Sequence, residues 1–471
     1  MRIQLQLRLT TDDGAAISDT EVIRLDKGED WLAMLGPSLD DAKALLTQLQ
    51  AQIVTAQAGA YVANHRLCPV CGCRLQSKDQ GQIVFRTAFG NVPLSSPRFH
   101  RCACDPVQTR TFRPLTGLLT EHTAPELLFL ETKWASLVSY GMTIDLLKDV
   151  LPIAATASAA TVRNHLHKVA KCCEAELGEE RPCFIEGCPA EWAELPIPEG
   201  PIIVGIDGGY VRNWDDRKDN FEVIVGKSVP EDREHRYFGL VQTHDDKPKR
   251  RLFEVLHDQG FQMNQEITFL TDGADSLRRM VGNMSPCAEH YIDWFHIAMR
   301  FTVVGQFVKG LAHHQPDDAA ALEGRLDRIK WRLWHGDGRE TVIRLDALAE
   351  DVDALECDYP NLKRFAKTSA EFAAYIRNNV GSIPNCGEHW RYGAVISTSF
   401  VESTVNVLIS KRFCKKQQMQ WTPEGAHLLV QTRAQTLDGT LRGRFERWYP
   451  GLAANGHEIS STTSTITAAA A

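Results

Sequence analysis

Three acidic residues stand at positions from which their carboxylates can meet in one pocket. Asp207 follows the apolar run 202–206, and Asp272 follows the apolar run 267–270. Each run predicts a strand, so we expect each carboxylate to emerge at the carboxyl edge of a sheet, where active sites are favoured. Glu402 lies among apolar residues at helical spacing, which predicts a helix that presents it to the two strands.

Carboxylates in a cluster repel one another unless cations neutralise them. Two Mg²⁺ or Mn²⁺ ions roughly 3.5–4 Å apart are the usual means of running an in-line displacement at phosphorus. The acidic set therefore predicts metal-dependent chemistry on phosphodiester bonds. Each residue alone has an ordinary alternative, because Asp before Gly is common in turns and Glu on a helix is common at the surface.

The order of the surrounding elements favours the catalytic interpretation. Between the two aspartates, the sequence predicts two strands and a helix, at 221–229, 237–243 and 249–260. Strand, strand, strand, helix, strand is the order of a ribonuclease H-like core. A helix, a short strand at 287–292 and a helix-rich stretch at 297–396 then precede Glu402. We expect a multidomain α+β protein with a ribonuclease H-like, retroviral-integrase-type catalytic core that carries an all-helical insertion.

With these motifs, the chain resembles the insertion-sequence transposases of the ISKra type, Asp-Asp-Glu enzymes related to the Mutator-like elements. The resemblance covers roughly residues 60 to 450, through the early cysteine pairs, IDGGYV, TDGAD, DWFH and the run from Ser399 to Gly439. It implies that Asp207, Asp272 and Glu402 bind two catalytic metal ions, with Asp207 bridging both. It also implies that water first frees a 3′-hydroxyl, which then attacks target DNA.

A second motif follows the second Asp. Asp293-Trp294-Phe295-His296 fits the Cys-or-Asp, two residues, His pattern of Mutator-like transposases. Asp293 and His296 are therefore candidate supporting residues, and His296 can orient a water or touch the scissile phosphate. The alternative is that His296 is a structural hydrogen-bonding residue in a buried helix.

Length and composition indicate several domains in a reducing compartment. The 471 residues are 43% hydrophobic and include 13 cysteines, an odd number that argues against a disulfide framework. No run approaches a membrane span of about 20 apolar residues, and the amino terminus lacks the apolar block of a signal peptide. We expect a cytoplasmic, nucleoid-associated bacterial protein.

The net charge of -8 is unusual for a DNA-binding protein, but the charge is unevenly distributed. Basic residues outnumber acidic ones at 61–112 and 411–447, whereas 174–199 holds eight Glu and one Arg. A basic cluster follows Glu402, and it is predicted to contact the DNA backbone through Lys411, Arg412, Lys415 and Lys416. The alternative is a solvated helix end.

Two close cysteine pairs predict a structural zinc site. Cys68-Pro-Val-Cys71 and Cys102-Ala-Cys104 offer four thiolates to one tetrahedral Zn²⁺, with a hairpin-like stretch between them. The pattern indicates a zinc ribbon, although the interval is longer than usual. Cys73 or His100 can replace one ligand, and unmetallated thiols are the alternative to a metal site.

A helix-turn-helix-like region is predicted next, from helices at 143–150 and 158–173. The second helix carries polar residues suited to the major groove: Thr161, Arg163, Asn164, His167 and Lys168. A helical linker bundle is the alternative. The resemblance favours DNA binding, since such transposases need a domain that finds the terminal inverted repeats of the element.

The remaining segments complete the expected organisation. Residues 1–60 should form a β-hairpin and an amphipathic helix with a short coiled-coil-like seam, which packs within the monomer or forms a dimer contact. In the insertion, Trp331, Trp334 and Trp390 either stack on bases or form the local core. The expected modules are 1–60, 61–115 (zinc ribbon), 116–173 (helix-turn-helix-like), 174–200 (acidic linker), 201–296 (core, first part), 297–396 (insertion), 397–450 (core, last part) and 451–471 (disordered tail).

Taken together, the residues and the resemblance predict a transposase that binds the inverted repeats of its element and cuts and joins double-stranded DNA, as a homodimer or larger assembly. Two rivals stay open. One is a host-adopted DNA-binding regulator with an idle core, and the other is a ribonuclease H-fold nuclease that cannot join strands.

Overall fold

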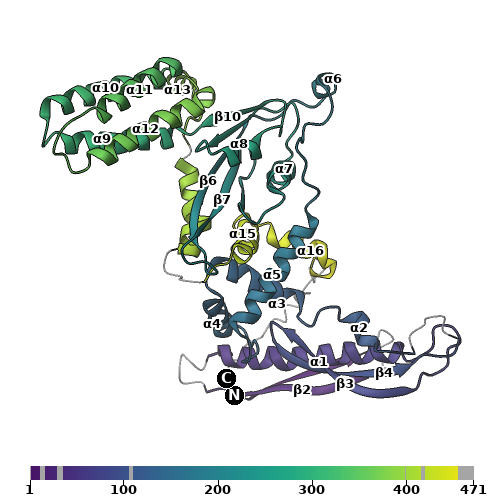
Figure 1. The fold of residues 1–471 in the computed structure, drawn as a ribbon. Coiled ribbons are helices and arrows are strands. Elements are labelled where there is room, and N and C mark those ends of the chain that lie inside the picture. Colours follow the sequence, from purple (N-terminus) through teal and green to yellow (C-terminus); the bar gives the residue numbers. More distant parts are fainter. Residues whose placement is uncertain are drawn as a thin grey trace, which may run out of the picture. The chain divides into compact units, whose positions relative to one another are not determined.

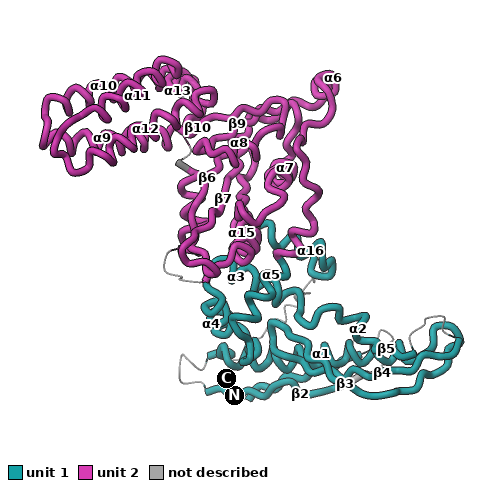
Figure 2. The backbone as a smooth tube through the Cα atoms, viewed as in Figure 1, with its two compact units in different colours: residues 1–169, 439–471 teal, residues 170–438 magenta. Residues whose placement is uncertain are grey.

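The computed structural model describes residues 2–10, 16–28, 35–104, 110–397, 399–414 and 420–453. The chain is a mixed α+β protein that divides into two compact units (Figure 2). The first unit contains residues 1–169 and 439–471, and the second contains residues 170–438. Within the described ranges, no helix is both long and apolar enough to cross a membrane.

The first unit begins with an antiparallel hairpin of β1 (Arg2–Thr10) and β2 (Ala16–Asp26). The turn expected at residues 12–14 lies outside the described residues. Helix α1 (Leu39–Asn64) starts at Ser38, whose hydroxyl accepts the Asp41 backbone N–H at 3.1 Å in a capping box. This helix packs on β2 and β4, so its apolar side is used within the unit (Figure 1).

A three-stranded antiparallel sheet follows, formed by β3 (Ser77–Thr87), β4 (Gly90–His100) and β5 (Thr111–Phe112). Gly90 has a φ of 110°, which suits glycine at the β3–β4 turn. The rest of the unit is helical, with α2 (Pro114–Leu118), α3 (Pro125–Leu137), α4 (Tyr140–Val150), the start of α5 (Ala159–Glu176), α16 (Leu441–Trp448) and η4 (Pro450–Leu452).

The second unit is built on a five-stranded sheet in the order β10-β9-β6-β7-β8. The strands are β6 (Ile202–Arg212), β7 (Asn220–Pro230), β8 (Arg236–Val241), β9 (Ile267–Thr271) and β10 (Ala288–Ile292). β7 pairs antiparallel with both β6 and β8, whereas β9 pairs parallel with both β6 and β10.

Helices cover both faces of this sheet because its strands are apolar on both sides. On one face, α7 (Pro248–Asp258) and α8 (Asp275–Val281) contribute to a core with Ile202, Val204 and Phe269. The almost fully buried α15 (Pro423–Leu437) packs against β8 and β7. Between β10 and α15, the chain forms the helical insertion and then α14 (Ser399–Val405) and the π-helical segment η3 (Asn406–Cys414).

The acidic segment 174–200, which was predicted to be an extended linker, packs against the core through part of its length. The Phe184 side chain is 1% exposed and lies in the core beneath α7. The Glu180 carboxylate accepts the backbone N–H groups of Lys249 and Arg250 at 3.2 and 2.8 Å, so it caps the start of α7. The segment also contains the short helix α6 (Pro189–Ala193).

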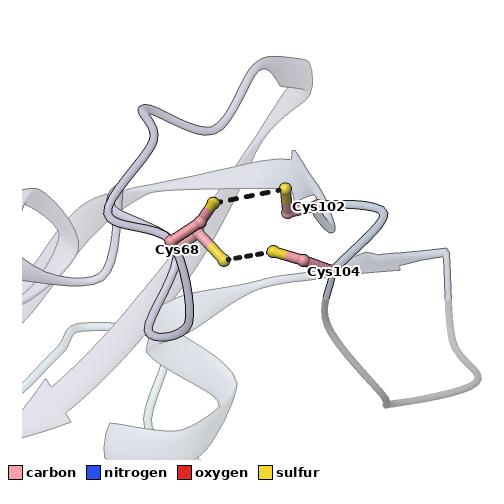
Figure 3. A group of neighbouring side chains, drawn as sticks. Cys68, Cys102 and Cys104 are labelled. Atoms are coloured by element: carbon pink, nitrogen blue, oxygen red, sulfur yellow. Dashed lines mark hydrogen bonds between the residues drawn. The ribbon is translucent and has the colours of Figure 1, made fainter.

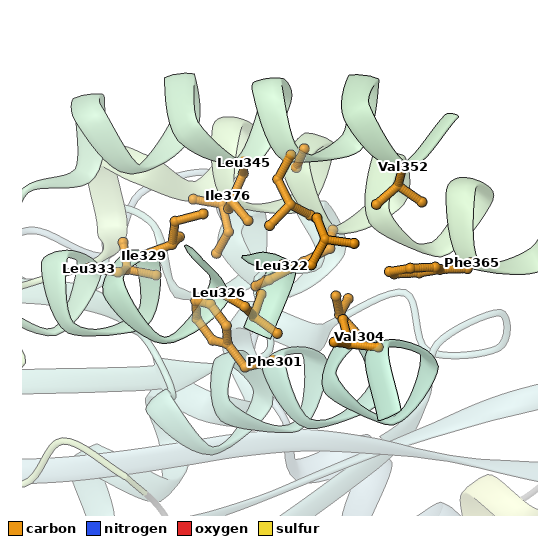
Figure 4. Close-up of a cluster of buried hydrophobic side chains, with 14 of the residues drawn as sticks. Phe301, Val304, Leu322, Leu326, Ile329, Leu333, Leu345, Val352, Phe365 and Ile376 are labelled. Atoms are coloured by element: carbon orange, nitrogen blue, oxygen red, sulfur yellow. The ribbon is translucent and has the colours of Figure 1, made fainter. Parts of the chain in front are cut away.

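The insertion is helical throughout the part that the structure describes. It consists of α9 (Trp294–Leu311), α10 (Pro316–Trp334), α11 (Gly338–Asp353), α12 (Leu362–Asn379), η2 (Val380–Ser382) and α13 (Cys386–Arg391). Figure 4 shows its own apolar core, which includes Phe301, Leu326 and Phe365. Trp334 packs edge-on against Trp294 at 4.8 Å, whereas Trp331 and Trp390 are exposed.

Candidate active site

The strand register brings three aspartates to the same level of the sheet. Gly205 of β6 lies opposite Leu270 of β9, so two more residues along each strand lead to Asp207 and Asp272. On the other side of β9, Ile292 of β10 lies opposite Thr271. The next residue after Ile292 is Asp293, and the next residue after Thr271 is Asp272. Asp207 within β6, Asp272 directly after β9 and Asp293 directly after β10 therefore stand at one level of three neighbouring parallel strands.

The position of Asp207 differs from the expected strand end. β6 continues to Arg212, and Asp207 pairs with Val225 of β7 in the middle of the strand. The parallel pairing of β6 with β9, however, extends only as far as Gly205. Asp207 is thus the second residue beyond that pairing, where the sheet opens on the side of β9.

Backbone N–H groups hold all three carboxylates. Gly208 donates to Asp207 Oδ1 at 2.8 Å, Ala274 donates to Asp272 Oδ1 at 2.9 Å, and Phe295 donates to Asp293 Oδ1 at 2.8 Å. For Asp293 this bond caps the start of α9, and its side chain is buried. Asp293 therefore has a structural role at the start of that helix, in addition to its negative charge.

Burial raises the pKa of Asp207 above its usual range. The backbone N–H of Gly208 and the nearby His296 oppose this effect, while the charges of Asp272 and Asp293 add to it. His296 Nε2 lies 3.9 Å from Asp207 Oδ1. The negative charge gathered around Asp207 is thus the kind that a cation or a protonated imidazole would stabilise.

A fourth carboxylate belongs to the same neighbourhood, which the sequence patterns did not indicate. Burial raises the pKa of Glu222 on β7, and the charges of Asp272 and Asp207 raise it further. A Cβ placed on Gly208 would lie only 2.4 Å from Glu222 Oε1, so glycine leaves the room that this carboxylate fills. Strand alternation would have placed Glu222 near Gly208 once the β6–β7 register was known.

Helix α14 runs beside β6 and β7 and carries Glu402. Lys227 of β7 lies opposite Gly205 of β6. Its ammonium lies 6.0 Å from the ring centre of Phe400, at the start of the helix. At the other end, Val405 Cγ1 lies 3.6 Å from the position of a Cβ built on Gly209. Glu402 lies between these two contacts on the helix, and its side chain is exposed.

The donor chemistry of this site fits a divalent cation, since Asp207, Asp272 and Glu402 offer hard carboxylate oxygens. Asp207 and Asp272 are close enough to influence each other's charge. The three carboxylates do not all lie within 4.8 Å of one another, so at least one of the distances between them is longer than that.

A different group of possible ligands is filled by a guanidinium. Glu174, Asp245 and His427 lie within 4.8 Å of one another. Arg251 occupies their centre and donates to Asp245 at 2.8 Å and to both Glu174 oxygens at 2.8 and 2.9 Å. Burial opposes charge on Glu174, but hydrogen bonds from His427 and Arg251 outweigh it and lower the pKa to about 2. This cluster is therefore an ion-pair network that stabilises the fold.

The insertion contacts the loop that carries Asp272. On α12, the Tyr375 hydroxyl donates to the backbone carbonyl of Asp272, and Asn379 accepts a hydrogen bond of 2.6 Å from Arg278. Gly273 has a φ of 90°, and a Cβ there would lie 2.7 Å from Asn379 Oδ1. The helical pattern of α12 predicts its apolar side, but it does not indicate these contacts with residues 100 positions earlier.

The predicted basic contacts after Glu402 are only partly available. Lys411 is exposed, but Arg412 is 0% exposed and its guanidinium carbon lies 5.1 Å from the Trp421 ring centre. This burial removes Arg412 from the predicted DNA contacts, because the π-helical turn directs it into the core. Lys415 and Lys416 lie outside the described residues.

The polar residues predicted to read DNA lie on α5. Arg163, Asn164 and Lys168 are exposed, whereas Thr161 and His167 are half-buried. Lys168 forms an ion pair with Glu121, which reduces the positive charge that it presents. The opposite side of the helix is apolar, with Val162 and Leu166 fully buried.

Four cysteine sulfurs gather at one end of the three-stranded sheet. Cys68, Cys71, Cys102 and Cys104 have all their Sγ atoms within 4.8 Å of one another. The Cys68 and Cys104 sulfurs lie 3.5 Å apart (Figure 3), and the Cys71 and Cys102 sulfurs lie 3.7 Å apart. A tetrahedral ion with Zn–S bonds of about 2.3 Å would place its sulfurs about 3.8 Å apart. The four thiols therefore fit zinc.

A tight backbone turn brings the first cysteine pair of this cluster together. Gly72 has a φ of 69° and donates to the Cys68 carbonyl at 2.9 Å, which forms a tight turn between the two ligands of the first pair. The Cys73 backbone N–H lowers the pKa of the Cys71 thiol to about 6, as suits a thiolate ligand. Cys73 itself lies near Cys102 at 3.5 Å, but it is not one of the four mutually close sulfurs.

Comparison with known proteins does not identify a family. No family model matches the chain, and no curated protein matches it. Among solved structures, the chain is similar to the Drosophila P element transposase strand transfer complex, with 10% sequence identity over 69% of this chain and 80% of that chain. The TM-score is 0.23, which is too low to assign a fold or a function.

Proposed function

We propose that this chain is a DNA transposase of the ISKra type, in which Asp207, Asp272 and Glu402 hold the catalytic divalent ions. The observation that carries the proposal is the alignment of Asp207 and Asp272 at one level of adjacent parallel strands, beside the helix of Glu402. The strand order β8-β7-β6-β9-β10, with the first three antiparallel, is the order expected of a ribonuclease H-like core. The resemblance of IDGGYV, TDGAD and DWFH supports the same class.

Divalent ions bound to these carboxylates would neutralise charge at the phosphate and activate the attacking oxygen. The protein itself positions the carboxylates. Backbone N–H bonds orient Asp207 and Asp272, and His296 Nε2 stands 3.9 Å from Asp207 Oδ1, an ion-pair distance that is longer than a direct hydrogen bond. In the resting protein, the carboxylates repel one another, so binding of cations relieves a cost already present in the fold.

DNA is the proposed partner of the other modules. The four-cysteine cluster would hold a structural zinc, since its sulfur spacing fits a closed tetrahedral site without an open position. Arg163 and Asn164 on the exposed side of α5 would contact the element ends. Two such ends would be paired by a homodimer or a larger assembly.

A joining assay tests the proposal against a nuclease of the same fold. Purified protein and Mg²⁺ are supplied with a pre-cut inverted-repeat end that carries a free 3′-hydroxyl, together with a supercoiled plasmid. A transposase joins the end to the plasmid, whereas the same end with a 3′-deoxy terminus gives no product. Cleavage of uncut ends without joining would indicate the nuclease, and specific binding with neither reaction would indicate a repurposed DNA-binding protein.

A further inference from the structure

A cavity of about 580 Å³ lies beyond the carboxylates, at the far end of the β6–β7 hairpin. Its lining comes from the end of β6, from the loop between the two strands and from the residues around Trp421. Backbone bonds fix that loop, since Asn213 donates to Asp219 at 3.2 Å and Trp214 donates to the Trp421 carbonyl at 2.8 Å. The volume falls in the range of small-molecule sites, which is about 300–1,000 Å³.

Exposed aromatic rings form part of the wall. Tyr210 is 68% exposed and Trp214 is 38% exposed. The Arg217 guanidinium carbon lies 4.2 Å from the Trp214 ring centre, so a cation covers one part of the indole. Flat aromatic and guanidinium surfaces are the features on which unpaired nucleic-acid bases stack.

The cavity also offers a hydrogen-bond donor. Asn213 Oδ1 already accepts the Asp215 backbone N–H at 3.1 Å, which leaves its NH₂ group to donate.

Charge adds a contact for the DNA backbone. The described residues that line the cavity include Arg212 and Arg217 but no Asp or Glu, so a phosphate beside a bound base would meet positive charge. The carbonyl oxygens and ring nitrogens of a base are acceptors that match the amide donor of Asn213.

The distance to the carboxylates suits a nearby nucleotide. Tyr210 is three residues after Asp207 on the same strand, which corresponds to about 10 Å at the rise of a β-strand. One DNA strand advances about 3.4 Å per nucleotide along a duplex, so the same distance corresponds to about three nucleotides. We propose that this cavity holds an unpaired base of the DNA strand, about three nucleotides from the scissile phosphate. This proposal rests on the proposed function.

Binding of single-stranded oligonucleotides in buffer without Mg²⁺ tests the cavity without requiring cleavage. Fluorescence anisotropy would compare dT₁₂ with a dT₁₂ in which the bases are replaced by abasic spacers. Wild-type protein should bind dT₁₂ at least 5-fold more tightly than the abasic strand. Trp214→Ala should bind dT₁₂ 5- to 100-fold more weakly than the wild type and should lose the preference for bases. Arg217→Ala, a change at the exposed surface, should weaken binding in the same direction.

The matched control is Tyr392→Ala, because Tyr392 is also an exposed aromatic residue but lies on the insertion. Equal effects of Trp214→Ala and Tyr392→Ala, no effect of either, or equal binding of dT₁₂ and the abasic strand by the wild type would overturn the proposal. Tighter binding of rU₁₂ than of dT₁₂ would overturn the assignment to DNA. If the base preference through Trp214 is found but joining and cleavage fail, the cavity stands and the transposase function falls. If cleavage is found but the base preference through Trp214 is absent, the transposase function stands and the cavity proposal falls.

Discussion

The Tyr375 hydroxyl donates a hydrogen bond of 2.8 Å to the backbone carbonyl of Asp272. This bond connects the helical insertion directly to the loop that carries the second carboxylate of the site. Arg300, on another helix of the insertion, places its guanidinium carbon 3.8 Å from the Tyr375 ring centre. Burial raises the pKa of this tyrosine to about 12, so the hydroxyl remains a donor at neutral pH. The insertion therefore positions Asp272.

Tyr375→Phe should slow Mg²⁺-dependent strand cleavage by about 2- to 10-fold, because one neutral hydrogen bond contributes about 0.5–1.5 kcal/mol. The variant should also need more Mg²⁺ for half-maximal rate, since the carboxylate of Asp272 is less well oriented. Tyr392→Phe is the control, as Tyr392 is 82% exposed on the same insertion. A Mg²⁺ dependence identical to that of the wild type would show that Tyr375 has no positioning role.

The purified protein should contain one zinc ion per chain. Cys71→Ser or Cys104→Ser should lower the zinc content to near zero by elemental analysis, because each removes one of four ligands. Cys73→Ser should retain the ion, since this thiol is near the cluster but is not one of the four mutually close sulfurs. Loss of zinc from Cys73→Ser together with its retention in Cys104→Ser would mean that the ligand set is assigned wrongly.

Arg251→Ala should lower the unfolding free energy of the second unit by about 3–5 kcal/mol, because it leaves the buried Asp245 and the partly buried Glu174 without their cation. Urea denaturation would measure the loss. Arg325→Ala breaks an ion pair with Asp351 that is much more exposed, and it should cost less than about 1 kcal/mol. Similar losses in the two variants would contradict the structural role of the Arg251 network.

Asp438 should make the second unit less stable at pH 7 and above than at pH 4. Burial raises its pKa to about 7 from the ordinary value of 3.8, so the folded state holds an extra proton between these values. The unfolding free energy should therefore fall as pH rises from about 4 to 7. Asp438→Asn cannot ionise, and its amide oxygen can still accept the Tyr237 N–H that Asp438 accepts at 3.0 Å.

Thermal unfolding of Asp438→Asn and the wild type across pH 4–8 checks this effect. The variant should be more stable at pH 8, on the order of 2 kcal/mol, and the difference should vanish towards pH 4. Asp353→Asn, at an exposed helix end, serves as the control. A stability difference that does not change with pH would rule out the titration of Asp438 as its cause.

The sequence could predict the two aspartates together because apolar runs identify strands, and parallel strands share an edge. The register that aligns Asp207 with Asp272 was not predictable, since it depends on hydrogen bonds between strands about 65 positions apart. Glu222 was missed for the same reason. Its place beside Gly208 follows from the pairing of β6 with β7 and from no local pattern.

Two expectations differ from the structure where tertiary packing overrides composition. Arg412 belongs to a basic run that resembles a DNA contact, yet the π-helical turn buries it against Trp421. The acidic segment after α5 has the composition of a linker, but a single aromatic residue, Phe184, anchors it in the core. In both cases the burial of one side chain determines how the segment is placed. The amino-acid composition of the segment does not identify that side chain.

The most direct test of the active site is single-turnover cleavage of inverted-repeat DNA in Mg²⁺ by wild-type protein, Asp207→Asn and Asp275→Asn. Asp275 lies three residues after Asp272, its side chain is 82% exposed, and it serves as the matched control. We expect cleavage by the wild type and by Asp275→Asn, and a loss of at least 1,000-fold in Asp207→Asn with binding to the DNA ends unchanged, which corresponds to about 4 kcal/mol. Cleavage by Asp207→Asn at the wild-type rate would contradict the assignment of the catalytic carboxylates.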